Sequence, residues 1–290
     1  MTQMERKGLN LCLKIKFSDG LGGVCNFANP KTFTEKIQWL KLYDCTKEKV
    51  RLADKYLVRE WIKQEIGNEY LIPLLGVWDS FDEIDFEDLP KSFVLKCNHG
   101  AKMNIIVRDK EKLDKEKIRK LINGWLEQDF GLCEGTFQLQ YSLIPRKIIA
   151  EKYMEETGFT DLRDYKFFCF NGQPMYCQVI SDRSENETVD FFDMKWNHLD
   201  FTGLACFRNS SEEISAPKSL EKMVSLSQTL SKNFSFVRVD FYEIDGKPYF
   251  GEMTFTPASG LGHFEPDEMN KVLGDLIQLP EKKPIPKVKK

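Results

Sequence analysis

Two acidic side chains near the end of the chain, Asp240 and Glu252, could together hold a divalent cation. Arg238 and Asp240 alternate with apolar residues in one run, and Glu252 and Thr254 flank Met253 in the next. Side chains of a strand alternate between its two faces, so each polar pair shares one face. Mg²⁺ prefers oxygen ligands from one or two carboxylates, completed by substrate phosphates. The pattern therefore indicates a magnesium site formed by Asp240 and Glu252.

The turn between these runs decides whether the two carboxylates face the same side. A two-residue turn at Asp245-Gly246 would pair Asp240 with Gly251 and direct Glu252 to the opposite face. The alternative to a metal site is that Asp240 and Glu252 merely flank Arg238 in a solvated salt-bridge face.

A three-residue loop gives the other register. With Gly246 in the left-handed conformation, Asp240 would pair with Phe250 and Arg238 with Glu252, so that both carboxylates lie diagonally on one face. We expect this longer loop, because two carboxylates that point into one space are explained by a bound cation.

The elements that must position these residues follow from the spacing of apolar residues. Helical spacing predicts helices at residues 32–43, 46–66, 114–129 and 220–234, and Lys55 falls inside the second of them. Strands are expected at 92–96, 104–107 and 148–154, and two hairpins pair 165–170 with 174–180 and 237–244 with 248–254. The sequence thus predicts an α+β fold with antiparallel sheets.

Composition restricts the class of protein. The 290 residues suffice for one large or two modest domains, and 42 basic against 45 acidic residues give a net charge of −3, which argues against nucleic-acid binding. No apolar run has the length of a membrane span, and the N-terminus lacks the pattern of a secretory signal, so we expect a cytoplasmic protein. Eight cysteines without a CxxC pair indicate reduced thiols and no structural zinc site.

Arg238-x-Asp240, followed across a turn by Glu252-x-Thr254 and Pro257, resembles the metal-binding end of ATP-grasp enzymes. Most of those ligases carry asparagine where Thr254 stands here. Further pieces resemble the family in the same order along the chain: Asp54-Lys55, Phe93-Val-Leu-Lys96, Asn98-His-Gly-Ala-Lys-Met-Asn104, Ile149-Ala-Glu151-Lys-Tyr-Met154 and Asp164.

The sequence is most similar to the TupA-like branch of that family, named for a teichuronopeptide biosynthesis protein. The similarity covers roughly residues 10–275 and rests on five motifs, at residues 29–41, 54–56, 145–154, 164–172 and 251–255. It implies two α+β lobes whose antiparallel sheets clasp a nucleotide, with a short helical N-terminal piece. The expected division is a helical region at 1–90, a small lobe at 91–153, a large lobe at 154–278 and a flexible basic tail at 279–290.

The resemblance also implies roles for individual residues. ATP would be bound through its phosphates, its adenine and its ribose by Lys55, Lys96, Glu151, Tyr153, Met154, Asp164 and Lys166. Mg²⁺ would lie on Asp240, Glu252 and Thr254. Arg238 would stabilise charge that develops on the acyl phosphate or tetrahedral intermediate, and Arg183 would contact the substrate carboxylate. Weaker candidates for substrate binding are His99, Ser259 and His263.

The activity implied by the family is ATP- and Mg²⁺-dependent ligation of a carboxylate to an amine through an acyl phosphate. The expected product is a surface polysaccharide, or its precursor, that carries an amino acid or amino sugar. Alternatives are a kinase of the same fold, a metal-dependent glycosyltransferase and a nucleotide-sensing module without catalysis. The expected partners are small molecules or saccharides, and the sequence does not indicate an oligomeric state.

Overall fold

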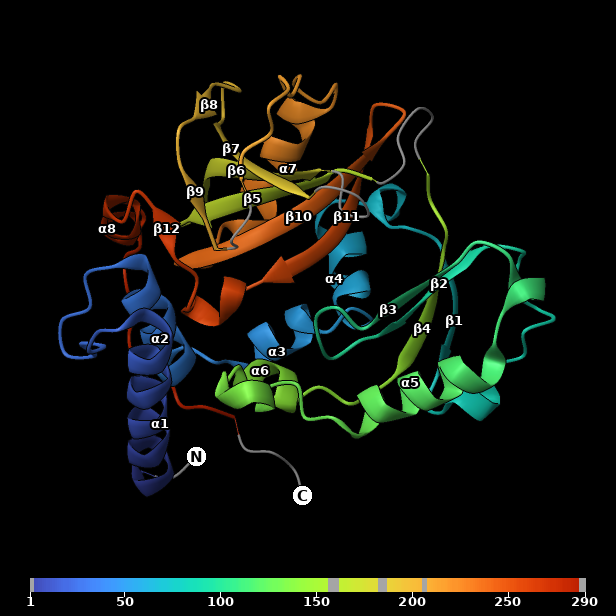
Figure 1. The fold of residues 1–290 in the computed structure, drawn as a ribbon, viewed down its shortest axis with the longest axis horizontal. Helices are drawn as coiled ribbons and strands as arrows, with labels where there is room; N and C mark the ends of the chain where they lie inside the picture. The colour runs from blue at the N-terminus through green and yellow to red at the C-terminus, as the bar shows by residue number, and fades with distance from the viewer. Residues whose placement is uncertain (1–2, 156–161, 182–186, 205–207, 287–290) are drawn as a thin grey trace. The chain divides into compact units, whose positions relative to one another are not determined.

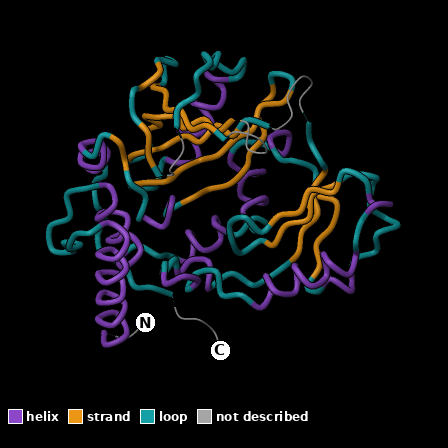
Figure 2. The backbone as a smooth tube through the Cα atoms, in the orientation of Figure 1, coloured by secondary structure: helices purple, strands orange, loops and turns teal. Residues whose placement is uncertain are grey.

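The computed structural model describes residues 3–155, 162–181, 187–204 and 208–286. The chain forms two compact units (Figure 1). Unit 1 contains Met1–Thr46, Gly135–Phe137 and Glu155–Lys290, and unit 2 contains Lys47–Glu134 and Gln138–Met154. The expected mixture of helices and antiparallel sheets is confirmed (Figure 2).

Unit 1 is built on an antiparallel sheet that has six strands within the described ranges, in the order β11-β10-β5-β6-β7-β8. The strands are β5 (Asp164–Phe170), β6 (Gln173–Ser181), β7 (Thr188–Asp193), β8 (His198–Leu199), β10 (Phe236–Ile244) and β11 (Lys247–Thr254). The remaining elements are α1 (Gln3–Leu21), α2 (Phe33–Tyr43), α7 (Leu220–Ser231), α8 (Glu268–Leu276), the short turn η5 (Pro257–Gly260) and the small pair β9 (Thr202–Gly203) and β12 (Phe264–Glu265). Helix α7 packs on β5, β6 and β10 (Figure 1).

Helix α2 begins with the capping box that its sequence predicts. The Thr32 hydroxyl accepts the Glu35 N–H, and the Glu35 carboxylate accepts the Thr32 N–H. At the start of this helix the buried Phe33 ring makes edge contacts with Phe236 of β10 and Phe264 of β12. The cap therefore fixes α2 where its first aromatic residue packs against the end of the sheet.

Strands β10 and β11 are joined by a two-residue turn, so the expected three-residue loop is wrong. Ile244 pairs with Lys247, and Asp245 and Gly246 both have positive φ, 53° and 76°, as a tight hairpin turn requires. The register shifts by one residue between Asp240 and Phe241. This β-bulge re-aims the end of β11.

The bulge changes which residues face each other. Asp240 lies directly opposite Glu252, and Arg238 lies opposite Thr254, instead of the diagonal arrangement expected from the longer loop. The extra residue is Gly251, where an added Cβ would lie 3.1 Å from the Asp240 carbonyl oxygen. Glycine thus allows the backbones to approach closely and leaves both carboxylates on one face.

Unit 2 contains an antiparallel sheet with four described strands in the order β1-β4-β2-β3. These are β1 (Leu74–Trp78), β2 (Phe93–Cys97), β3 (Asn104–Val107) and β4 (Ile148–Lys152). Its helices are α3 (Lys47–Ala53), α4 (Val58–Glu65), α5 (Lys115–Glu127) and α6 (Leu139–Ser142), with short 3₁₀ turns η1 (Asn68–Tyr70), η2 (Phe81–Glu83), η3 (Lys110–Lys112) and η4 (Cys133–Gly135). Ile118 and Ile122 of α5 share a buried core with Phe93 and Leu95 of β2.

The single helix expected at residues 46–66 is wrong, because the chain breaks between α3 and α4. The Asp54 carboxylate accepts the backbone N–H groups of Tyr56 and Leu57, at 2.8 and 3.2 Å. Such side-chain bonds to nearby backbone compete with the helix. Lys55 therefore lies in a turn rather than within a helix.

The cysteines described by the structure are free thiols. Burial raises the pKa of Cys25, Cys97 and Cys169 to about 12, so these groups stay protonated near neutral pH. Cys12 in unit 1 and Cys133 in unit 2 are partly exposed. Among the helices that the structure describes, none is long and apolar enough to cross a membrane.

Candidate functional site

Three neighbouring strands of unit 1 bring the predicted metal-binding residues together. Glu252 of β11 lies opposite Asp240 of β10, and Asp240 lies opposite Lys166 of β5. We call the group Asp164, Lys166, Arg238, Asp240, Glu252 and Thr254 the carboxylate cluster. Because residues that face each other across strands share a face, alternation along β5, β10 and β11 places all six on one side of the sheet.

Asp240 is the centre of the carboxylate cluster. Its side chain is only 3% exposed, and Arg238 donates to both of its oxygens at 2.7 Å. Lys166 Nζ donates to Oδ2 at 2.6 Å and lies 3.6 Å from Asp164 Oδ1. Burial disfavours a charged Arg238, but the adjacent Asp240 outweighs it and raises the pKa of the guanidinium. Arg238 is thus a permanent cation.

Glu252 is the accessible carboxylate of the cluster, with 32% of its side chain exposed. Its Oε1 accepts from the Thr254 hydroxyl at 3.1 Å and lies 3.4 Å from Arg238 Nη2. Arg238 Nη2 also donates to Thr254 Oγ1 at 3.1 Å. The guanidinium therefore holds both side chains of β11 in place.

The donor set of the carboxylate cluster fits Mg²⁺. It offers hard oxygen atoms from Asp240, Glu252 and Thr254, and its three carboxylates exceed its two cations by one charge. Within the part of the chain that the structure describes, no three His, Cys, Asp or Glu side chains converge as a complete metal site. Mg²⁺ commonly takes one or two protein carboxylates and completes its shell with water and phosphate oxygens.

A second buried carboxylate organises unit 2. Glu151, at the end of β4, accepts from Lys96 Nζ at 2.6 Å and from Arg59 Nη1 at 2.8 Å. Arg59 also donates to the Ile72 carbonyl oxygen at 2.6 Å, and burial lowers the pKa of its guanidinium. We call Lys96, Glu151 and Arg59 the Glu151 cluster, whose two cations exceed its one carboxylate.

Arg59 is a site residue that the sequence did not reveal. It lies on α4, outside every motif, and only the fold brings it to Glu151. The Glu151 carboxylate fixes Lys96, one of the residues predicted to bind ATP.

The same sheet face carries a small apolar surface beside Lys96. Val94 of β2 lies opposite Glu151 on one side and opposite Ile106 of β3 on the other, so these three share a face with Lys96. The Ile106 side chain is 49% exposed. An apolar surface next to a cation can accept a flat heterocycle joined to phosphate.

Asn98 ties together three of the predicted motifs. Its side chain, which is fully buried, donates to Asp54 Oδ1 and to the Pro145 carbonyl at 2.9 Å each and accepts the Lys147 N–H at 2.7 Å. The Asn98 carbonyl accepts the Lys55 N–H. This amide therefore anchors the base of the loop that follows β2 and contains Gly100.

That loop is closely packed at its base. Lys55 Nζ donates to the Gly100 carbonyl at 2.5 Å, and a Cβ on Gly100 would lie 2.6 Å from Met103 Sδ. The His99 ring is buried and donates from Nε2 to the Trp125 carbonyl at 3.0 Å. Burial lowers the pKa of His99, so the ring is neutral near pH 7.

The other predicted residues lie as follows. Tyr153 and Met154 follow β4 at the end of unit 2, and the Tyr153 hydroxyl accepts from Arg108 Nε at 3.3 Å. His263 Nε2 donates to the Gly20 carbonyl at 3.1 Å. Arg183 lies outside the described residues.

Ser259 belongs to a left-handed turn that follows β11. Ala258, Ser259 and Gly260 have φ of 45°, 57° and 64°. Lys41 Nζ donates to the Ser259 carbonyl at 2.5 Å and to the Thr136 carbonyl at 2.7 Å, while Gln38 Nε2 donates to the Ser259 and Gly260 carbonyls. Two buried polar side chains of α2 thus hold the turn in this strained form.

Residues 35–278 match the sequence model of the family described as TupA-like ATP-grasp. The chain belongs to this family. The resemblance expected from the five motifs is therefore confirmed, and so is the ATP-grasp fold class, with antiparallel sheets in two compact units. No curated protein matches the chain in sequence.

Several solved structures resemble this TupA-like ATP-grasp protein. D-alanine–D-alanine ligase from Bacillus anthracis, complexed with ATP, is 18% identical over 71% of this chain and 54% of its own, with a TM-score of 0.40. L-amino acid ligase from Bacillus licheniformis is 13% identical over 77% and 43%, with a TM-score of 0.42. The ATP-grasp ligase PsnB, complexed with a variant of its minimal precursor, Mg and ADP, is 10% identical over 84% and 64%, with a TM-score of 0.43. This chain spans about half the length of the first two ligases.

Proposed function

We propose that this TupA-like ATP-grasp protein is an ATP- and Mg²⁺-dependent ligase that joins a carboxylate to an amine. The observation that carries the proposal is the row formed by Glu252, Asp240 and Lys166 across three strands, with Arg238 beside it. Such a row offers oxygen ligands for a cation together with fixed positive charge for an oxyanion. Membership of the ATP-grasp family supports the same conclusion.

Each residue has a role that its contacts make possible. Asp240, Glu252 and Thr254 would hold Mg²⁺, which neutralises phosphate charge when it is bound. Lys96 and Lys55 bind phosphate oxygens, and Glu151 orients the Lys96 ammonium for that purpose. The adenine lies on the apolar surface that includes Ile106. Asp164 and Lys166 bind the ribose and a phosphate, and Tyr153 and Met154 bind the adenine edge.

The proposed reaction has two steps. The carboxylate oxygen of the acid attacks the γ-phosphorus and expels ADP, which gives an acyl phosphate. The amine then attacks the acyl carbon, loses a proton to solvent and displaces inorganic phosphate. Arg238 stabilises the negative charge that develops on oxygen in both steps, because its planar fork is held in place by Asp240.

The acceptor is proposed to be a saccharide or saccharide precursor of a bacterial surface polymer, to which an amino acid or amino sugar is attached. This part rests on the family to which the chain belongs. Ser259 and His99 are proposed as further substrate contacts, and so are His263 and Arg183.

The test is product analysis with Mg-ATP and a panel of amino acids, sugar acids and amino sugars. A ligase releases ADP and inorganic phosphate together with an amide, whereas a kinase of the same fold gives ADP and a phosphorylated product. Stabilisation by UDP-sugars but not by Mg-ATP in a thermal-shift experiment would instead indicate a glycosyltransferase. Nucleotide binding without turnover of any panel member would indicate a sensing module and contradict the proposal.

A matched pair of variants tests the metal site directly. Glu252→Gln removes one charge from the carboxylate cluster and is expected to abolish Mg²⁺-dependent ADP formation. Glu221→Gln makes the same chemical change at an exposed position on α7 and is expected to leave activity unchanged. Full activity of Glu252→Gln would reject the assignment of Mg²⁺ to this cluster.

A further inference from the structure

The last strand of the unit 2 sheet presents backbone groups that the sheet does not use. Among the strands that the structure describes, β3 ends the strand order and pairs with β2 alone. Cys97 donates its N–H to the Met103 carbonyl, and bonded pairs alternate along an antiparallel ladder. Leu95 and Ile105 are therefore a hydrogen-bonded pair, whereas the N–H and C=O of Ile106 point away from β2. The edge of β3 is thus a template for one more strand.

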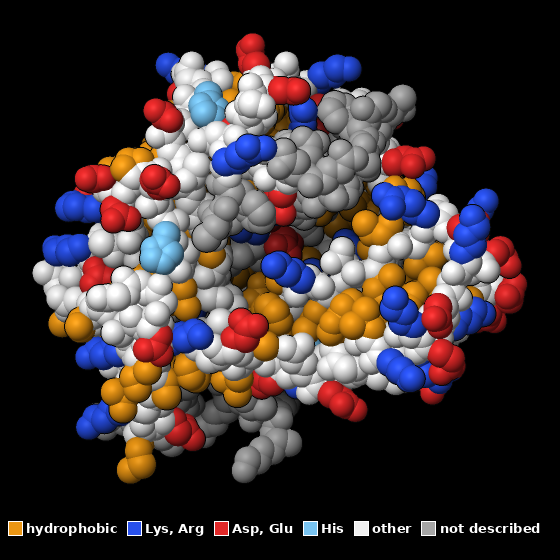
Figure 3. Space-filling view, in the orientation of Figure 1, with side chains coloured by type: hydrophobic (Ala, Val, Ile, Leu, Met, Phe, Trp, Pro, Cys, Tyr) orange, Lys and Arg blue, Asp and Glu red, His pale blue; other side chains and the backbone are white. Residues whose placement is uncertain are grey.

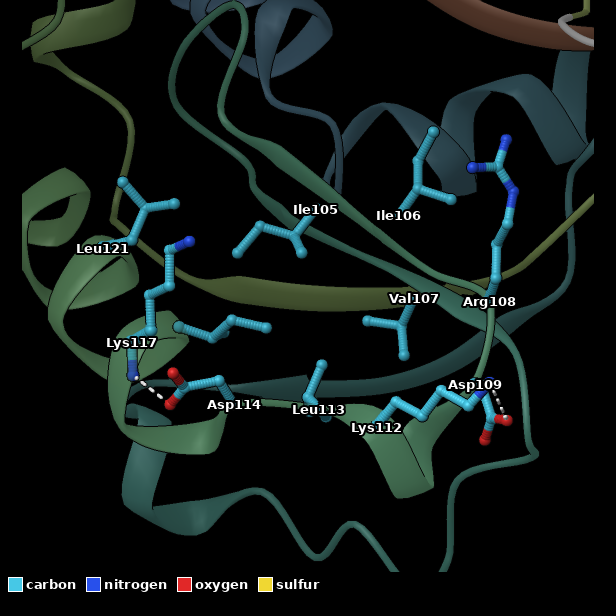
Figure 4. A pocket seen from close by; sticks show the side chains of 11 residues that line it. Ile105, Ile106, Val107, Arg108, Asp109, Lys112, Leu113, Asp114, Lys117 and Leu121 are labelled. Carbon is cyan, nitrogen blue, oxygen red and sulfur yellow. Dashed lines mark hydrogen bonds and ion pairs between the residues drawn. The ribbon is translucent and has the colours of Figure 1, made fainter.

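A groove runs between this edge and helix α5. It encloses about 520 Å³ and is lined by six apolar and five charged residues. Figure 4 shows side chains that approach this space from both elements. The residues used here are Ile105, Val107, Leu113, Lys117 and Leu121, which we call the β3–α5 groove. Leu121 is 44% exposed. Ile106 and Arg108, which lie on the other face of β3 by the alternation of side chains along the strand, also contribute to the lining of this space.

The charge around the β3–α5 groove is positive although the whole chain is negative. Among the residues that line the groove, three are basic and two are acidic, a net charge of +1 against −3 for the whole chain. The Asp114 carboxylate accepts the Lys117 N–H, and the Asp109 carboxylate accepts the Glu111 N–H, so both acids cap short turns of backbone. Figure 3 shows hydrophobic side chains exposed on unit 2 with lysines and arginines beside them.

We propose that the β3–α5 groove binds an extended segment of a partner protein whose groove-facing positions, every second residue, carry apolar side chains in the middle of the segment and acidic side chains at its ends. The segment pairs its backbone with the free edge of β3, inserts alternate apolar side chains between Val107 and Leu121, and places carboxylates near Lys117 and Lys112. Main-chain pairing supplies affinity, and the side chains that enter the groove supply specificity. The positive rim selects an acidic segment over a basic one.

The test is selection of random nine-residue peptides displayed on phage against the full-length protein, with Leu121→Asp protein as the counter-selection. Enriched peptides are expected to carry β-branched or aromatic residues at every second position in the middle and acidic residues near the ends. A synthetic copy of one selected peptide is then measured by fluorescence anisotropy. Leu121→Asp is expected to weaken its binding at least tenfold and Lys117→Glu at least fivefold.

Matched controls separate the groove from general surface effects. Leu132→Asp changes another leucine of unit 2 with similar exposure, 48%, and Lys120→Glu reverses a charge elsewhere on α5. Both are expected to change binding less than twofold. N-methylation of alternate peptide amides is expected to abolish binding, because it removes the donors that pair with β3.

Several results would overturn the proposal. The selection would contradict it by enriching no peptide or by enriching basic peptides. The binding measurements would contradict it if the N-methylated peptide bound as tightly as the unmodified one, or if the control variants lost as much affinity as Leu121→Asp. Conversion of a dimer to a monomer by Leu121→Asp in sedimentation experiments would assign the groove to a second copy of this chain. Binding to anionic lipid vesicles that is lost in the same variant would assign it to a membrane surface.

Discussion

Each unit of this protein holds one buried carboxylate between two cations, yet the two arrangements differ in charge and in construction. In unit 1, Asp240 lies between Arg238 and Lys166, with further carboxylates beside it. In unit 2, Glu151 is the one carboxylate of its cluster and lies between Lys96 and Arg59. The first group carries one excess negative charge and suits a cation, and the second carries one excess positive charge and suits a phosphate.

The construction of the two groups differs as well. The carboxylate cluster is assembled on three adjacent strands, so its geometry follows from strand register alone. The Glu151 cluster joins two strands with a helix, because Arg59 comes from α4. A change in register should therefore affect the first group, whereas a change in helix packing should affect the second.

The largest expected effect is that of Asp240→Asn. Removing this charge leaves Arg238 and Lys166 buried without their common partner, which should cost about 3–5 kcal/mol of unfolding free energy. Activity should fall at least about 10³-fold, since the metal and Arg238 both lose a fixed contact. Urea denaturation and ADP release measure the two effects. Glu252→Gln, at an accessible carboxylate, should lose activity with less than about 1 kcal/mol of stability.

Glu151→Gln is the corresponding change in unit 2. It leaves Lys96 and Arg59 without a carboxylate, and we expect a loss of about 2–4 kcal/mol together with weaker ATP binding. Isothermal titration with Mg-ATP and urea denaturation measure these quantities. The double variant Glu151→Gln, Arg59→Gln should recover part of the stability, because it removes one of the unpaired cations. Equal stability of the single variant and the wild type would refute the structural role of Glu151.

Lys41 sharpens the comparison because this buried cation binds carbonyl oxygens rather than a carboxylate. Burial lowers its pKa to about 7, only slightly opposed by Cys25. Between pH 7 and about 10 the unfolded chain holds a proton that the folded chain has lost, so stability should rise with pH by about 1 kcal/mol per unit. Lys41→Met should remove this slope, as urea denaturation at several pH values would show. An identical slope in both proteins would contradict the assignment.

The smallest effects are expected at two glycines of the β10–β11 hairpin. Gly246→Ala places a side chain at φ 76°, and Gly251→Ala places one 3.1 Å from the Asp240 carbonyl oxygen. Each should cost about 1–2 kcal/mol, through backbone strain and crowding respectively. Only Gly251→Ala should raise the Mg²⁺ concentration needed for half-maximal activity, because only this residue lies beside Glu252. Equal Mg²⁺ dependence in the two variants would show that the bulge does not aim the carboxylate.

The sequence predicted those parts of the molecule whose determinants are local. Asp245-Gly246 marked the hairpin, and the Thr32 capping box marked the start of α2, because turn and cap residues act within four positions. The shared face of Asp240 and Glu252 was also expected. The reason given for it was wrong, since a bulge at Gly251 and not a longer loop produces the register. A bulge depends on how two backbones approach, which no pattern in one strand reveals.

The parts that could not be predicted depend on contacts between distant segments. Arg59 reaches Glu151 across 92 positions of sequence, and Asn98 connects Asp54 with residues near Pro145. No spacing rule covers such pairs. The break between α3 and α4 was also missed, because helical periodicity continued through a position where the Asp54 side chain competes for backbone donors.

The partly exposed thiols have a practical consequence. Cys12 lies in unit 1 and Cys133 in unit 2, whereas burial keeps Cys25, Cys97 and Cys169 protonated and slow to react. Maleimide dyes should therefore label the native protein at one position in each unit, once Cys206, which lies outside the described residues, is replaced by serine. Replacing one of these two thiols by serine then leaves a dye in one unit alone, so that the response of each unit to a nucleotide can be followed separately.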